Sequence, residues 1–92
     1  MAQATARNIL VESEEECNAL KAEIENGATF ESIAQAKSQC PSGSAGGDLG
    51  SFGPGQMVPE FDKVVFSADI GVVQGPVKTQ FGYHLLEVTS RS

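Results

Sequence analysis

Few side chains in this sequence have the potential for chemistry, and only one of them is an imidazole. His84, the single histidine, lies in the stretch KTQFGYHLLEV at residues 78–88. The two cysteines, Cys17 and Cys40, are far apart and form no CxxC pattern. Zinc sites and disulfide frameworks need several suitably spaced ligands or cysteines, so we expect reduced thiols and no metal. A lone histidine in a strand is more often a buried structural residue than a catalytic one, so His84 needs support from its surroundings.

The glycine-rich residues 40–57, CPSGSAGGDLGSFGPGQM, suggest a phosphate-binding loop as one alternative. The stretch lacks a GK[ST] sequence, and its glycines do not lie between a hydrophobic strand and a helix, so we reject that function. A flexible linker is the second alternative. The apolar residues Leu49, Phe52 and Met57 recur at intervals and favour a structured loop with a short strand at DLGSF, residues 48–52.

The first half of the chain predicts a strand and two helices that could position these residues. Residues 5–11, TARNILV, have the β-branched and aliphatic character of a strand. Ser13 caps a helix whose acidic first turn suits the positive end of the helix dipole, and Gly27 ends it. Thr29 caps a second helix that ends near Ser38. Their apolar positions repeat at helical spacing and are Cys17, Leu20, Ile24, Phe30, Ile33 and Ala34.

The second half predicts one more helix and a hairpin. Pro59 suits the first position of a helix whose apolar face is Phe61, Val64, Val65 and Ala68. Residues 72–79 and 82–90 predict two strands joined by a tight turn. Alternation along the last strand places His84 on the core side with Leu86 and Val88, opposite Tyr83, Leu85 and Glu87. The expected order is β-α-α-loop-β-α-β-β.

Length and charge exclude several classes of protein. A chain of 92 residues predicts a single domain spanning residues 1–92. The net charge of -6, with no cluster of lysines or arginines, argues against a nucleic-acid partner. The longest apolar runs are far shorter than a membrane span, and no signal pattern begins the chain. We therefore expect a cytoplasmic monomer with no membrane partner and nothing removed, although the sequence leaves open whether the chain was cut from a larger protein.

Three motifs together resemble the parvulin family of peptidyl-prolyl cis/trans isomerases. They are GGDLG, GQMVPEF and FGYH, within the stretches CPSGSAGGDLGSFGPGQMVPEFDKVVF and GPVKTQFGYHLLEV, and an ILV segment near the start agrees with them. The resemblance covers nearly the whole chain and is strongest to small free-standing bacterial parvulins. It implies an α+β fold with a four-stranded antiparallel sheet surrounded by helices, and an enzyme that accelerates rotation about X-Pro bonds.

The reaction that this resemblance implies needs no cofactor. Rotation must overcome a barrier of roughly 18–20 kcal/mol, but no bond is made or broken. An apolar pocket for the proline ring and a few preorganised hydrogen-bonding groups are sufficient. The expected partners are proline-containing peptides or unfolded protein chains.

By position in the motifs, the resemblance also assigns the site residues. The proline pocket is expected from Leu49, Met57 and Phe61, with Phe52 and Phe81 lining or supporting its wall. The polar group is expected from Cys40, Thr79, His84 and Asn8. Cys40 is expected to act through its field and shape rather than by covalent attack.

Asn8 stands where parvulins have a first histidine. Asparagine does not titrate, but it can donate and accept, so we expect it to bond either the ring of His84 or the hydroxyl of Thr79 and to preserve activity. Two alternatives remain open: a chaperone-like module that binds peptides with little or no catalysis, and an interaction domain without a peptide groove.

Phosphate specificity is not expected from this sequence. Parvulins that prefer phosphorylated Ser/Thr-Pro carry basic residues in the loop after the first strand. Here that loop is ESEEE, in which Glu12, Glu14, Glu15 and Glu16 would repel a phosphate. An apolar, uncharged or basic residue before proline is expected instead.

Overall fold

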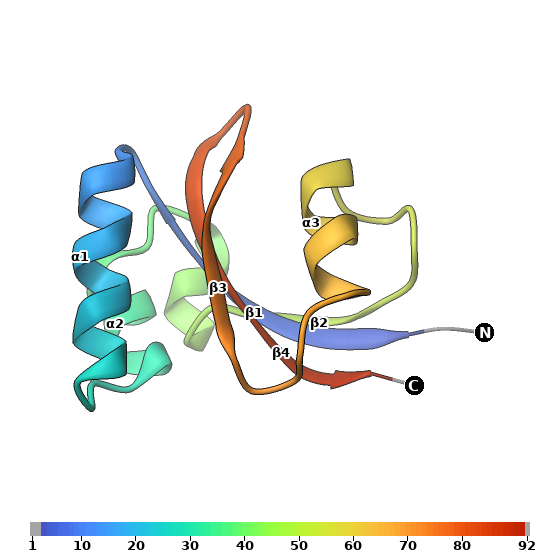
Figure 1. Ribbon diagram of the computed structural model, residues 1–92, viewed down its shortest axis with the longest axis horizontal. Helices are drawn as coiled ribbons and strands as arrows, with labels where there is room; N and C mark the ends of the chain where they lie inside the picture. Colours follow the sequence, from blue (N-terminus) through green and yellow to red (C-terminus); the bar gives the residue numbers. More distant parts are fainter. Residues whose placement is uncertain (1–2, 92) are drawn as a thin grey trace.

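Four strands form one antiparallel sheet that runs through the middle of the molecule (Figure 1). The computed structural model describes residues 3–91, excepting the side chains of residues 41 and 42. The strands are β1 (Ala4–Val11), β2 (Asp48–Phe52), β3 (Val73–Thr79) and β4 (Gly82–Arg91). Their order in the sheet is β2-β1-β4-β3, so the first and last strands are its central pair. This is the α+β architecture expected from the sequence.

Helices cover both faces of this sheet. They are α1 (Glu14–Glu25), α2 (Phe30–Lys37) and α3 (Pro59–Val65). Figure 1 shows α1 and α2 on one side of the sheet and α3 on the other. In the 3–91 region no helix is long and apolar enough to cross a membrane.

Local signals set the helix ends, as the sequence predicted. The hydroxyl of Ser13 accepts a hydrogen bond from the N–H of Glu16 at 3.1 Å, and that of Thr29 accepts one from the N–H of Ser32 at 3.2 Å. Each bond satisfies an N–H that has no partner within its helix. Gly27, just past α1, has a φ of 114° that side chains rarely adopt, so the chain can turn there toward α2.

The sheet separates two hydrophobic cores. The first, toward α1 and α2, contains Ile9, Val11, Cys17, Leu20, Phe30, Ile33, Ala34 and Leu85. The second, toward α3, contains Ala4, Ala6, Phe52, Val65 and Val88. The sequence pattern predicted one core side, with Leu85 facing away from it. That was incomplete, because helices cover both faces and Leu85 is as fully buried as Leu86.

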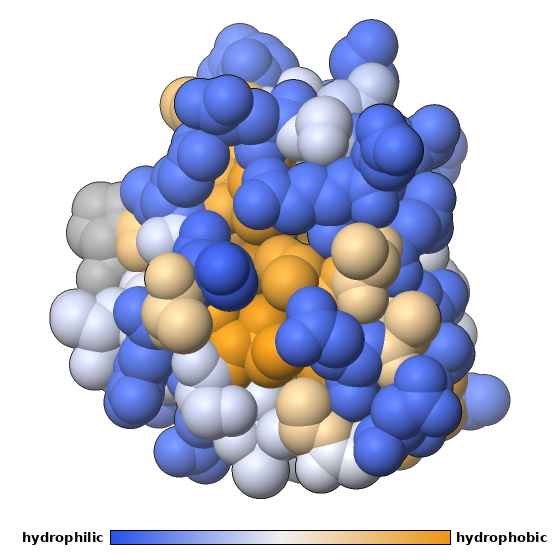
Figure 2. Space-filling view, turned by 90° about the vertical axis from the view of Figure 1, so that its left-hand side faces the viewer, coloured by the Kyte–Doolittle hydropathy of each residue, from blue (hydrophilic) through white to orange (hydrophobic). Residues whose placement is uncertain are grey.

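The first core is less completely covered at its edge. Figure 2 shows the face on the α1 side, where hydrophilic side chains surround a central area with visible hydrophobic atoms. Ile24 of α1 and Val73 of β3 pack against this core and are only half-buried. These half-buried side chains leave the edge of the first core partly open to solvent.

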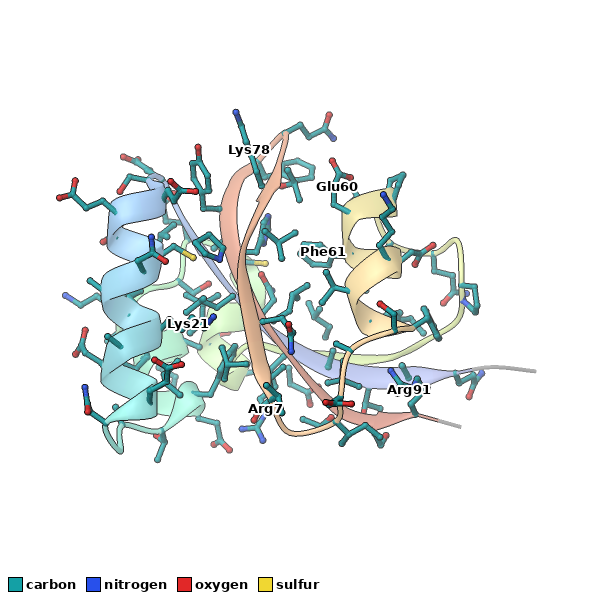
Figure 3. All side chains as sticks on the ribbon, viewed as in Figure 1. Arg7, Lys21, Glu60, Phe61, Lys78 and Arg91 are labelled. Carbon is teal, nitrogen blue, oxygen red and sulfur yellow. The ribbon has the colours of Figure 1, made fainter. Side chains whose placement is uncertain are left out.

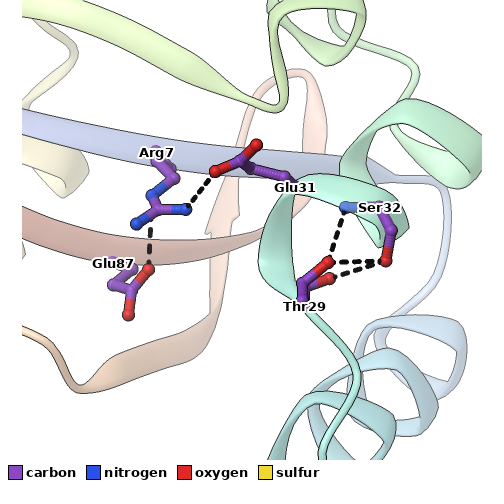
Figure 4. Close-up of polar contacts among 5 residues, drawn as sticks. All are labelled: Arg7, Thr29, Glu31, Ser32 and Glu87. Atoms are coloured by element: carbon purple, nitrogen blue, oxygen red, sulfur yellow. Dashed lines mark hydrogen bonds and ion pairs between the residues drawn. The ribbon is translucent and has the colours of Figure 1, made fainter.

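Arg7 ties β1 to its neighbours. Its guanidinium forms ion pairs with Glu31 of α2 at 3.3 Å and with Glu87 of β4 at 3.4 Å (Figure 4). The same group lies 6.0 Å from the ring centre of Phe30. Partly exposed ion pairs add little stability each, but together these contacts hold the strand in place directly beside Asn8, whose side chain faces the other way.

The glycine-rich segment is structured, as expected, and it adds a short 3-10 helix, η1 (Pro41–Ala45), before β2. Gly47 presses this segment against β1: the N–H of Asn8 donates to its carbonyl oxygen at 2.9 Å. A Cβ on Gly47 would lie 2.5 Å from the carbonyl oxygen of Asn8, and its φ is 86°. Only glycine allows this approach.

Candidate active site

An apolar pocket opens on the α3 side of the sheet. Its volume is about 310 Å³, near the lower end of the range typical of small-ligand sites. It is lined by Asn8, Leu10, Cys40, Leu49, Met57, Val58, Phe61, Phe81 and His84. Every site residue expected from the sequence is on this wall except Phe52 and Thr79.

Helix α3 and the loop before it place the apolar wall. Gly55 donates its N–H to the Asp62 carboxylate at 2.7 Å, which fastens the loop carrying Met57 to the helix. Pro59, two residues after Met57, is the first residue of α3, and proline has no backbone N–H that would need a partner there. Phe61 then points from α3 toward the sheet (Figure 3), where it is almost completely buried.

The ring of Phe61 meets the ring of His84 edge to face. The ring centres are 4.6 Å apart and the planes cross at 87°. Such a contact fixes both rings and adds to the stability that their burial provides. The pocket wall and the histidine are therefore one packed unit.

His84 is held by hydrogen bonds at both ring nitrogens. Its Nδ1 lies 3.0 Å from Oδ1 of Asn8, and its Nε2 lies 2.8 Å from Oγ1 of Thr79. The Thr79 oxygen also accepts the N–H of Phe81 at 3.2 Å. Asn8, Thr79 and His84 are all buried. Of the two partners expected for Asn8, the ring of His84 and the hydroxyl of Thr79, its side chain bonds the ring.

These contacts define the tautomer of His84. An amide oxygen can only accept, so Nδ1 carries the hydrogen and donates to Asn8. Nε2 must then accept from the Thr79 hydroxyl, whose oxygen receives the Phe81 N–H. Burial lowers the pKa of His84 from 6.5 to about 4, and the nearby Glu60 opposes the shift only partly. The ring is therefore neutral at pH 7, and the network carries no net charge.

Cys40 reaches the pocket because its loop is bonded to β1. The hydroxyl of Ser38 accepts the N–H of both Leu10 and Cys40, at 3.1 and 3.3 Å. The N–H of Gln39 donates to the carbonyl of Leu10 at 2.8 Å. Cys40 is partly exposed on the pocket wall. The other cysteine, Cys17, is fully buried in the first core, and burial raises its pKa to about 11, so it is an unreactive core thiol as predicted.

Phe52 and Thr79 do not line the pocket, but both are close to their expected places, Phe52 supporting the wall and Thr79 in the polar group with His84. Phe52 is not among the residues that line the pocket; it is buried in the second core and meets Phe66 edge to face, with ring centres 6.3 Å apart. Leu49 and Met57 pack against that core, so Phe52 supports the wall from behind. Thr79 acts through His84 instead of lining the same pocket. Leu10 and Val58 also line the pocket and were not expected there, although alternation from Asn8 and the position before Pro59 could have indicated them.

A second hollow, of about 500 Å³, has a different character. It lies on the sheet side that Arg7 and Glu31 occupy, and Thr5, Asp48 and Thr89 also line it. An apolar ring would leave these polar groups without water or partners, so the smaller pocket beside His84 is the better proline site. Across residues 3–91 no group of three or more metal-ligating side chains is clustered.

Comparison with known proteins agrees with this geometry. The family model described as "Rotamase: PPIC-type PPIASE domain" matches residues 3–90. The chain belongs to the PPIC-type peptidyl-prolyl isomerase family. The foldase protein PrsA of Geobacillus kaustophilus is 45% identical to this parvulin domain over 87 residues, covering 94% of the chain and 31% of that protein.

Solved structures show the same parvulin fold. A crystal structure of the peptidylprolyl isomerase PrsA from Bacillus anthracis superposes with a TM-score of 0.96 at 37% identity, covering 99% of this chain and 42% of that one. The parvulin of Nitrosopumilus maritimus superposes with a TM-score of 0.88 at 30% identity, covering 98% of both chains. The resemblance to the parvulin family seen in the sequence is thereby confirmed: this is a rotamase domain. It spans about a third of the length of the curated foldases it matches.

Proposed function

We propose that this domain isomerises X-Pro bonds of unphosphorylated peptides and unfolded chains, with the proline ring in the pocket of Met57 and Phe61. The observation that carries the proposal is an apolar pocket with a neutral, hydrogen-bonded imidazole in its wall. Relatives named foldase or chaperone support protein chains as the substrates.

The geometry suits a reaction without proton transfer. Twisting the X-Pro bond breaks amide resonance and lowers the charge separation of the amide, so a dry apolar pocket favours the twisted form over the planar one. When Phe61 and Met57 hold the proline ring in place, the carbonyl side of the X-Pro bond is the part that rotates. The neutral His84 and the non-titrating Asn8 cannot serve as a charged acid–base pair at pH 7, and their role is to hold the wall in a fixed shape.

The selectivity against phosphate rests on the start of α1. Glu14, Glu15 and Glu16 are exposed, and Glu12 follows the end of β1, whose last residue pairs with Tyr83 of β4 near the hairpin tip. Phe81 of that tip lines the pocket. The negative charge of these carboxylates would disfavour a phosphorylated residue near this end of the sheet.

The proposal can be tested by exchange NMR on short peptides with catalytic amounts of the domain. The cis and trans forms of Ala-Pro peptides should interconvert much faster than without enzyme. The rate increase for phosphoserine-Pro peptides should be at least tenfold smaller. Met57→Ala should lower kcat/KM about tenfold or more. Ile24→Ala, a matched loss of a half-buried apolar side chain on the other face, should leave kcat/KM near that of the wild type. Equal loss in both variants would contradict the placement of the site.

A second candidate function is peptide binding with slow turnover, which the replacement of the family histidine by Asn8 favours. In that case the same peptides would shift the NMR signals of Met57 and Phe61 without faster exchange. The monomeric state and the cytoplasmic location expected from the sequence stay predictions; sedimentation and cell fractionation would test them.

A further inference from the structure

A smaller hollow adjoins the proline pocket. Its volume is about 300 Å³, and it is lined by Val58, Pro59, Glu60, Thr79 and Gln80. Val58 borders both spaces, and Thr79 is the residue whose hydroxyl holds His84. A chain whose proline ring occupies the first pocket would therefore bring a flanking side chain to the second.

The carboxylate of Glu60 is the charged group of this hollow. Glu60 precedes Phe61 in α3, and Figure 3 shows it above Phe61, at the end of the helix near the turn between β3 and β4. It is exposed, and it forms no ion pair within the region that the structure describes. Its negative charge favours the protonated ring of His84 and so opposes part of the lowering of the His84 pKa by burial.

Neighbouring cations do not neutralise Glu60. Lys78 precedes Thr79 in β3, so strand alternation directs it to the opposite face, and Figure 3 shows it on the α1 side of the hairpin. Lys63 is one helical turn further along α3, exposed, and not within ion-pair distance of Glu60. The Glu60 carboxylate is therefore available to pair with a cation of a bound peptide.

We propose that the hollow at Glu60 receives the side chain next to the substrate proline and that Glu60 selects lysine or arginine there. This inference rests on the proposed function, because it needs the proline ring to sit beside Phe61. The long aliphatic stem of lysine or arginine would lie along Val58 and Pro59 while its charged end reaches the carboxylate. An acidic side chain in the same place would meet repulsion from Glu60.

The expected preference is modest, because the carboxylate is exposed to water. Partly exposed ion pairs change affinities about two- to fivefold. The lysine peptide should therefore bind about two- to fivefold more tightly than the alanine peptide. Its advantage over the glutamate peptide should be roughly the square of that factor, because attraction is gained and repulsion is avoided. Because solvent ions screen such pairs, 0.5 M NaCl should remove most of the preference.

The experiment compares six peptides of one length: Lys-Pro, Ala-Pro and Glu-Pro, and the same three residues placed after proline. Both kcat/KM by exchange NMR and Kd from NMR shift titration are measured for the wild type, Glu60→Gln and Glu60→Lys. Glu25→Gln is the control, because it removes the same charge from an exposed position at the far end of α1.

At one of the two positions the wild type should favour lysine, Glu60→Gln should lose the preference, and Glu60→Lys should reverse it toward glutamate. Glu25→Gln should behave as the wild type. Equal loss in Glu60→Gln and Glu25→Gln would mean that net charge alone sets the preference and would overturn the inference, as would an unchanged preference in Glu60→Gln. If no peptide is turned over, the proposed function fails, and the Kd ratios still decide the role of Glu60.

Discussion

The pKa of His84 makes a quantitative prediction about stability. Burial lowers this pKa from 6.5 to about 4, so between these values the unfolded chain binds a proton that the folded one does not. Stability is unaffected by His84 above about pH 6.5, falls as the pH drops from there, and stops falling below pH 4. A shift of this size corresponds to about 3 kcal/mol of unfolding free energy lost between pH 7 and pH 4.

The assay uses the fact that His84 is the only histidine. A ¹⁵N NMR titration of the ring should show a midpoint near pH 4 and, above it, the tautomer protonated at Nδ1. Urea unfolding of the wild type and His84→Gln at several pH values isolates the energy, because other groups titrate in both proteins. The advantage of the wild type at pH 7 should shrink by about 3 kcal/mol at pH 4. A ring midpoint of pH 6 or higher, or parallel curves for the two proteins, would refute this reasoning.

Three further substitutions test the network and its support. Asn8→His should change kcat/KM by less than a hundredfold, because the reaction moves no proton through this position; a hundredfold rise or more would show that the family histidine is needed. Cys40→Ala should keep most of the turnover on an Ala-Pro peptide, since no covalent bond to the thiol is required, and a loss beyond a hundredfold in the same assay would contradict that. Gly47→Ala should destabilise the domain by about 1–3 kcal/mol in urea unfolding, because its Cβ would lie 2.5 Å from the Asn8 carbonyl; wild-type stability would show that the loop can move away from β1.

The elements were predictable where local chemistry sets them. The hydroxyls of Ser13 and Thr29 cap their helices by accepting the N–H of the residue three positions later. Both helix N-termini could therefore be predicted from residues close together in the sequence. The proline at the start of α3 and the tight turn before Gly82 are equally local. All the strands were correctly expected for this reason, whereas the four-stranded antiparallel sheet was expected from the resemblance to parvulins.

The site could be predicted only through the family motifs. Asn8 and His84 are neighbours because β1 pairs with β4, and no periodicity in either strand indicates that pairing. Whether Phe52 lines the pocket wall or supports it from behind could not be predicted from the sequence either, because its burial depends on Phe66, which the second core brings against it. Burial of Leu85 was missed since alternation shows which residues share a face and not whether a helix covers it.

The sheet is a single layer of backbone between the pocket beside His84 and the first hydrophobic core. Along β4, His84 faces the pocket while the next residue, Leu85, anchors the same backbone among the side chains beneath α1 and α2. Along β1, Asn8 and Ile9 share the same relation. A change of volume at Leu85 or Ile9 would shift the backbone of a network residue with no intervening layer to absorb it. Substitutions behind the sheet can therefore alter the shape of this pocket while every residue that lines it stays unchanged.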